Sequence, residues 1–223
     1  MPKPFPKHLI VPFIALGSVW GLSETALGLG IQKCASYVSG SLMTGVALFF
    51  IAAAWASYRH FLGIVLVVLV ASLFKLFDAL LLSLPVLHGA VANPIFAFFL
   101  EGLALFILVM VFKKGFLEKK KGQAALGGTS ALLAVGLFPL VKFATGIPAC
   151  VYPGTGIPLS VYYGPLAVVL SILTVPLGFL AAEKIQSAAE ASSREPGRKA
   201  ISRILYPAAV ALCLLLAALV RVV

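Results

Sequence analysis

The sequence predicts an all-α fold, a polytopic transmembrane helical bundle with a six-helix core and a seventh appended helix. Composition is the first reason: of 223 residues, 61% are hydrophobic and only 11% are charged, and the mean hydropathy is +1.10. Soluble domains are about 45–50% apolar and about 25% charged, so lipid must be part of this chain's solvent. The second reason is a series of long apolar runs, and the third is the distribution of basic residues between them.

Seven apolar runs approach the length of about 20 residues that a helix needs to cross a bilayer. The runs lack the period-two alternation of membrane strands. The second is rich in Ala and Ser, and the fifth carries Gly127 and Gly128, so these two have the weakest signal. The predicted spans cover residues 9–30, 38–57, 61–85, 93–112, 123–143, 164–182 and 204–221.

The spans divide the chain into a six-span membrane core over 1–183, a cytoplasmic linker over 184–203 and a seventh transmembrane helix over 204–223. The linker is polar and mixed in charge, and its Glu195-Pro196-Gly197 run is typical of a flexible segment. The first span contains Glu24 and is followed by no clear small-residue cleavage site, so we expect it to be retained rather than removed as a signal peptide.

The lysines and arginines predict the orientation. With a cytoplasmic N-terminus, thirteen of them fall in inside segments, three fall outside (Lys33, Lys142 and Arg221), and Lys75 lies within a span. This bias follows the positive-inside rule. It also explains the formal net charge of +10 without a nucleic-acid partner, since no basic stretch is interleaved with aromatic residues. We expect a multi-pass protein of the cell (inner) membrane.

Four ionisable residues fall well inside predicted spans: Glu24, Lys75, Asp78 and Glu101. A charge facing lipid at a helix centre costs about 2.5–3.5 kcal/mol or more, so these side chains should face the bundle interior. In the predicted orientation they lie at or beyond the midplane on the outer side. They therefore predict an outward-opening polar pocket, and the excess of acids favours a solute with a positive or amine-like group.

Helix periodicity sharpens this prediction for Glu24. At about 100° per residue, Gly17, Gly21, Glu24 and Gly28 share one narrow face, and small residues allow helices to approach closely. Glu24 should therefore point into protein. Glu24 and Glu101 have no partner on their own helices, and each is either a ligand-facing acid or a protonated, hydrogen-bonded core acid.

The other polar candidates also carry two interpretations. Lys75 and Asp78 are three residues apart and share a helix face, so they either bind the solute or neutralise one another as a structural pair. Asn93 lies within about 80° of Glu101 around its helix. It is either a ligand residue or a cap at the start of the span, directly before Pro94.

The outer loop between the fifth and sixth spans is a candidate lid. Residues 146–164 are apolar, contain three prolines and carry Tyr152, Tyr162 and Tyr163. Tyr152 is the candidate for stacking on a planar ligand, although such tyrosines also form the aromatic belt at a membrane interface.

The remaining residue types indicate no chemistry of their own. Cys34 and Cys150 both map to the outside, where a disulfide can persist, and the sequence leaves their pairing open. Cys213 is expected to serve packing in the last span. No zinc-protease motif, nucleophile elbow or Walker loop is present in the sequence. We expect no catalytic residue, metal or cofactor, and no enzymatic activity.

The pattern resembles the substrate-binding (S) components of energy-coupling-factor (ECF) vitamin transporters. The likeness rests on the six-helix core, on the Gly/Ala-rich first helix and on the fourth helix with its Asn93-Pro94 start and inward Glu101. The resemblance covers about residues 9–183, and the seventh span departs from the family's usual six helices. It implies vitamin uptake energised by a membrane coupling subunit and ATPases. The family's Ala-x-x-x-Ala docking pattern on helix one corresponds here to Ala15, Val19 and Ser23, a partial match that ordinary helix packing also explains.

These observations predict a membrane-embedded binding subunit for uptake of a small, amine-bearing solute such as a vitamin or its precursor. Glu24, Lys75, Asp78, Asn93, Glu101 and Tyr152 are the candidate substrate-binding residues. One alternative is a stand-alone or proton-coupled transporter that uses the buried acids as relays. Another is a membrane enzyme acting on lipid, for which an acid cluster would face the cytoplasmic side.

Overall fold

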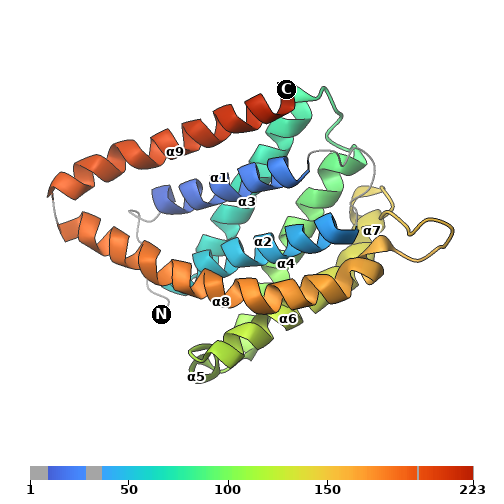
Figure 1. Ribbon diagram of the computed structural model, residues 1–223, viewed down its shortest axis with the longest axis horizontal. Helices are drawn as coiled ribbons and strands as arrows, with labels where there is room; N and C mark the ends of the chain where they lie inside the picture. Colours follow the sequence, from blue (N-terminus) through green and yellow to red (C-terminus); the bar gives the residue numbers. More distant parts are fainter. Residues whose placement is uncertain (1–9, 29–36, 195, 223) are drawn as a thin grey trace.

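The protein is an all-α bundle in a computed structural model that describes residues 10–28, 37–194 and 196–222 (Figure 1). Within these residues there is no strand, and Val151 and Pro158 form an isolated β-bridge. The elements in chain order are α1 (Ile10–Leu27), α2 (Tyr37–Tyr58), α3 (Phe61–Leu81), α4 (Gly89–Val111), α5 (Lys114–Leu117), α6 (Lys120–Leu137), the 3₁₀ turn η2 (Phe138–Leu140), α7 (Val141–Thr145), α8 (Leu159–Arg194) and α9 (Pro196–Val222).

All seven predicted spans are confirmed as helices long and apolar enough to cross a membrane. The fifth span is not one regular helix, because Pro139 lies in the 3₁₀ turn η2 between α6 and α7. Proline lacks the N–H that would continue the α-helical ladder. Gly146 then ends α7 with a φ of 75°, a left-handed conformation that glycine adopts at little cost.

Helix α1 packs against α3 through its glycines, as its small-residue face predicts. A Cβ at Gly17 would lie 2.7 Å from Val70 Cβ, and one at Gly21 would lie 2.4 Å from Phe74. Only glycine therefore allows this approach of the two backbones. On the core side of α1, Trp20 is 0% exposed and its ring lies 4.9 Å from that of Phe98 in α4.

Helix α8 is the longest described helix, and it packs along both α2 and α6 (Figure 1). Glycines again allow the contact: a Cβ at Gly127 of α6 would lie 2.1 Å from the Ser171 carbonyl, and one at Gly178 would lie 2.5 Å from the Phe49 carbonyl. Gly127, which weakens the apolar signal of its span, is thus part of a close helix–helix contact.

The structure differs from the predicted flexible linker over 184–203. Helix α8 continues to Arg194 and α9 begins at Pro196, so the described part of this segment is helical. The physical reason is that residues 181–191 are rich in Ala, Glu, Lys and Gln, which are strong helix formers. Pro196 is also compatible with the first turn of a helix, and Ala189 packs into the main core cluster.

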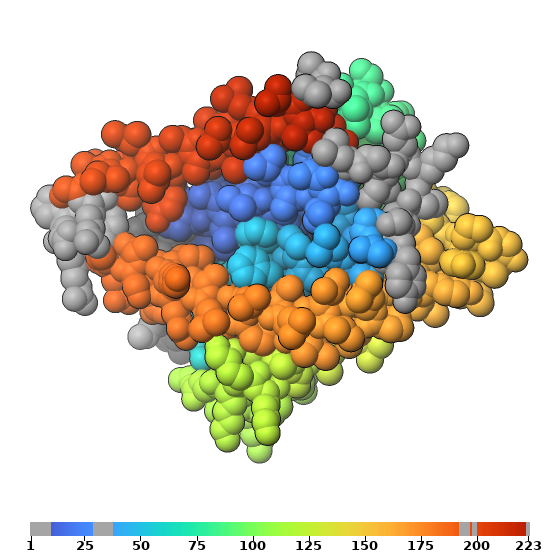
Figure 2. All heavy atoms as spheres, viewed as in Figure 1, coloured from blue at the N-terminus to red at the C-terminus, as the bar shows by residue number. Residues whose placement is uncertain are grey.

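The appended helix α9 lies at the edge of the bundle beside α1 (Figures 1 and 2). Cys213 and Ala217 are its buried residues, and they pack with Phe74 and the neighbouring side chains of α1 and α3. Most of its large apolar side chains are exposed, as expected for a helix that faces lipid: Ile201, Ile204, Leu205, Leu212, Leu215 and Leu219.

Candidate functional site: a polar cavity inside the bundle

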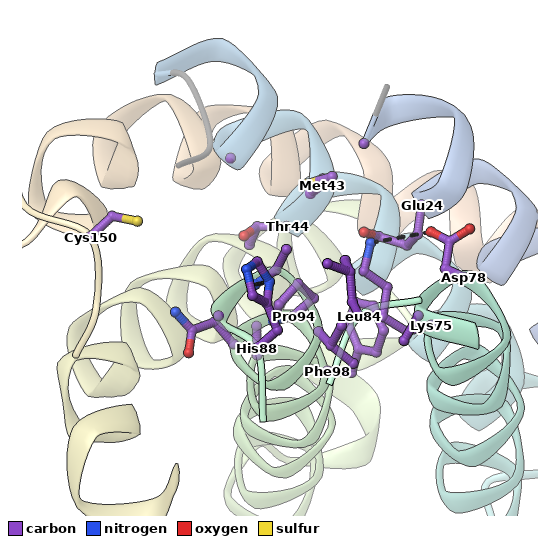
Figure 3. A pocket seen from close by; sticks show the side chains of 18 of the residues that line it. Glu24, Met43, Thr44, Lys75, Asp78, Leu84, His88, Pro94, Phe98 and Cys150 are labelled. Carbon is purple, nitrogen blue, oxygen red and sulfur yellow. Dashed lines mark hydrogen bonds and ion pairs between the residues drawn. The ribbon is translucent and has the colours of Figure 1, made fainter. Parts of the chain in front are cut away.

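A cavity of about 630 Å³ lies where α1, α3 and α9 end and where α2, α4 and α8 begin (Figure 3). Its size falls in the range of about 300–1,000 Å³ that is common for small-molecule sites. The apolar part of its wall includes Met43, Leu84, Pro94 and Phe98. Polar side chains from six helices complete the lining, so one end of the bundle holds a mixed, concave site.

Five of the six predicted substrate-binding residues line this cavity: Glu24, Lys75, Asp78, Asn93 and Glu101. The four charged ones are buried as predicted, with exposed fractions of 2%, 7%, 3% and 5% for Glu24, Lys75, Asp78 and Glu101. Residues from three different helices thus converge on one space. Their role in binding stays a prediction.

Glu24 is held by its own helix and leaves one oxygen unpaired. Trp20 Nε1 donates a 3.3 Å hydrogen bond to Glu24 Oε1. Glu24 Oε2 is buried and has no hydrogen-bond partner. Because Trp20 is packed on Phe50 and Phe98, the aromatic cluster fixes the position of this carboxyl group at the cavity wall.

Glu101 in α4 has a similar arrangement. The Thr44 hydroxyl of α2 donates a hydrogen bond to its carboxyl group, while Glu101 Oε2 is buried without a partner. Ser160 at the start of α8 is 1% exposed and its Oγ also has no partner. A buried polar atom without a partner costs free energy, so these atoms are suited to bind a ligand.

Asp78 belongs to a network that the sequence shows only in part. Lys75 Nζ lies 3.7 Å from Asp78 Oδ2, which matches the predicted same-face pair. The shorter contacts come from α9: Arg221 Nη2 donates to Asp78 Oδ2 at 2.6 Å and Arg221 Nε donates to Oδ1 at 3.0 Å. Asp78 therefore binds the seventh helix bidentately, and Lys75 also interacts electrostatically with Glu24.

Asn93 is not the N-cap of α4. The helix begins at Gly89, and the His88 side chain accepts a 3.2 Å hydrogen bond from the Ala90 amide. Pro94 lies inside the helix. Asn93 instead lines the cavity, and its Oδ1 is buried without a hydrogen-bond partner. Capping of α4 therefore does not explain the presence of an asparagine at this position.

Tyr152 is absent from the lining of the cavity, so its predicted place there is not supported. It is 43% exposed and stacks on Tyr162, with ring centroids 4.3 Å apart. A hydrogen bond from the Tyr152 amide to the Ile157 carbonyl, 3.0 Å long, closes the loop on itself. Tyr163, one residue beyond Tyr162, lines the cavity instead.

The sequence did not identify several polar residues of the cavity, among them Thr44, Ser160 and Arg221. Thr44 and Ser160 are short polar residues in apolar runs, which commonly hydrogen-bond to their own helix backbone, so the sequence holds no signal for them. Arg221 carried a signal, because it is a charge at the outer end of the predicted seventh span. The predicted orientation places it toward the same side of the membrane as Asp78.

The predicted docking residues do not form one exposed stripe. Ala15 is 8% exposed, whereas Val19 is 45% exposed. Ser23 is half-buried and donates a 2.6 Å hydrogen bond to the Trp20 carbonyl. Of these three residues, only Val19 has an exposed side chain that a partner could contact.

The two cysteines within the described residues differ in their bonding. Cys213 is buried and has no bond to another cysteine, in line with a packing role. Cys150 lines the cavity and is disulfide-bonded. Cys34, whose pairing with Cys150 the sequence leaves open, lies outside the described residues. No group of three His, Cys, Asp or Glu side chains that could hold a metal ion occurs in the described part of the chain.

Comparisons of the chain with models of protein families, with curated proteins and with solved structures gave no match. The fold and the spans define the class: this is a multi-pass helical membrane protein.

Proposed function

We propose that the chain is the membrane-embedded binding subunit of an uptake system for a small, amine-bearing solute, a vitamin or its precursor. The supporting observation is that buried oxygens of Glu24, Asn93, Glu101 and Ser160, none with a hydrogen-bond partner, all line one cavity of about 630 Å³. Carboxylate and amide oxygens accept hydrogen bonds. An amine or ammonium group supplies the matching donors.

The orientation adds direction to this proposal. If the N-terminus is cytoplasmic, as the basic residues predict, the ends of α1, α3 and α9 lie toward the outside. The cavity would then receive solute from outside the cell. The resemblance to ECF substrate-binding components adds the expectation that a membrane coupling subunit and ATPases provide the energy.

The experiment is a thermal-shift screen of the purified full chain in detergent against vitamins, their precursors and small amines. A ligand at 100 times its Kd stabilises the folded state by about 2.7 kcal/mol, a measurable rise in Tm. Glu24→Gln and Glu101→Gln should abolish the rise. Ser130→Ala is the matched control, because Ser130 Oγ is also buried without a partner but lies outside the cavity.

The proposal fails if no compound of the panel stabilises the wild-type chain and both glutamine variants keep the wild-type Tm.

The stand-alone transporter is the second candidate, because Glu24 and Glu101 lie close enough to interact electrostatically and intramembrane acids often act as proton relays. Uptake of an identified ligand into liposomes containing this chain alone would favour it. Uptake that needs added partner subunits would favour the binding subunit.

A further inference from the structure

We propose that Arg221 determines specificity in this cavity by donating hydrogen bonds to a neutral acceptor group of the solute, while Glu101 binds its amine. The inference rests on the proposed function and deepens it. It assigns the seventh helix to the binding site and defines the ligand as a monocation with an acceptor at the end opposite its amine.

Arg221 has more N–H donors than its two hydrogen bonds to Asp78 use. A guanidinium carries five N–H donors, and the two bonds to Asp78 use one on Nε and one on Nη2. Three N–H groups remain for other acceptors. Arg221 lines the cavity, and its side chain is only 11% exposed, so a bound solute is the natural acceptor for them.

Asp78 holds the guanidinium group of Arg221 rigidly. Asp78 binds it at two points, which fixes the plane of the group. The end of α1 lies close on another side, since a Cβ at Gly28 would be 3.5 Å from Arg221 Nη2. Asp78 is therefore a positioning residue, because each of its oxygens already accepts a hydrogen bond from Arg221.

The charge of the lining residues bears on the charge of the solute. The cavity contains three acids (Glu24, Asp78 and Glu101) and two bases (Lys75 and Arg221). With all three acids ionised and His88 neutral, one formal negative charge is uncompensated. Buried charges need compensation. A solute with one positive charge balances the site, and its second polar group must then be neutral.

The two ends of the site are separate. Figure 3 shows Glu24, Lys75 and Asp78 on one side of the cavity, whereas Thr44, the donor to Glu101, lies away from them toward His88. Arg221 is on the Asp78 side through its ion pair. The amine therefore belongs at the unpaired oxygen of Glu101, and the acceptor belongs at the end of α9.

The test uses two probes of equal shape, benzylamine and 4-(aminomethyl)pyridine, at slightly alkaline pH where both carry one positive charge. They differ by one ring nitrogen that accepts a hydrogen bond. Affinities come from the concentration dependence of Tm for the full chain in detergent. A hydrogen bond from a charged donor should make the pyridine compound bind wild type about tenfold more tightly.

Arg221→Gln should bind the two probes with equal affinity, and binding of either probe also shows that the variant is folded. Leu215→Ala is the control on the same helix, since Leu215 is 69% exposed, and it should keep the tenfold preference. Equal binding of both probes by wild type overturns the inference, as does a preference that survives in Arg221→Gln.

Two further outcomes are decisive. If Arg221→Gln binds neither probe, Arg221→Lys decides: a reduced preference supports the inference, and an unchanged preference overturns it. If wild type binds neither probe, while the screen described above finds no ligand, the proposed function fails and the inference fails with it. Failure of the preference alone leaves the proposed function intact.

Discussion

Arg221 in α9 forms a bidentate ion pair with Asp78 in α3, with bonds of 2.6 and 3.0 Å across 143 positions of sequence. Besides this pair, the small buried residues Cys213 and Ala217 of α9 pack against Phe74 and its neighbours. The ion pair therefore ties the appended helix to the wall of the cavity.

The first prediction concerns the stability contribution of this pair. Arg221→Leu leaves the Asp78 carboxylate buried with only Lys75 at 3.7 Å, and removing one partner of a buried pair costs about 3–5 kcal/mol. We expect a clear fall in Tm in detergent. The double variant Asp78→Asn/Arg221→Leu should recover part of the loss, because it removes both charges of the pair and leaves Lys75 to interact with Glu24. A double variant less stable than Arg221→Leu would contradict this account.

The second prediction tests the close contact of α1 with α3. Gly21→Ala places a Cβ within 2.4 Å of Phe74, and overpacking of this kind costs about 1–3 kcal/mol. We expect a lower Tm and weaker solute binding, because Glu24 follows one turn later. Gly136→Ala is the matched control, since a Cβ there would meet nothing within 4 Å, and it should match wild type.

The third prediction distinguishes a continuous helix from a flexible linker after the sixth span. Ser187→Pro lies within α8 (Leu159–Arg194), where proline costs about 3 kcal/mol or more. Cleavage by trypsin at Lys184 should become faster, because the local helix is broken. Equal cleavage rates in wild type and variant would show that the segment is already unfolded in the wild type.

The fourth prediction tests the orientation. Thr155→Cys, in the exposed loop before α8, should react with a membrane-impermeant maleimide in intact cells. Lys120→Cys, at the start of α6, should react only after the cells are permeabilised. The unmodified chain gives the background from its own cysteines. The reverse pattern would place the cavity toward the cytoplasm.

The helical spans could be predicted because they depend on local composition. Lipid cannot satisfy backbone N–H and C=O groups, so each long apolar run must form a helix whatever its neighbours are. The same argument identified Glu24, Lys75, Asp78 and Glu101, since a charge in such a run has to face protein. The helical tail of α8 was missed because Glu195-Pro196-Gly197 outweighed the helix-forming residues before it.

The composition and periodicity of the chain by themselves determined that it is a seven-span bundle with buried acids on the inward faces of its helices. Only the tertiary structure decided that those acids surround one cavity, that Tyr163 lies there in place of Tyr152, and that Arg221 takes both oxygens of Asp78. The physical reason is that helix formation and the cost of charge in lipid act along a single segment. The pairing of side chains instead depends on how far helices distant in sequence rotate and approach, which here is set by the glycines at their contacts.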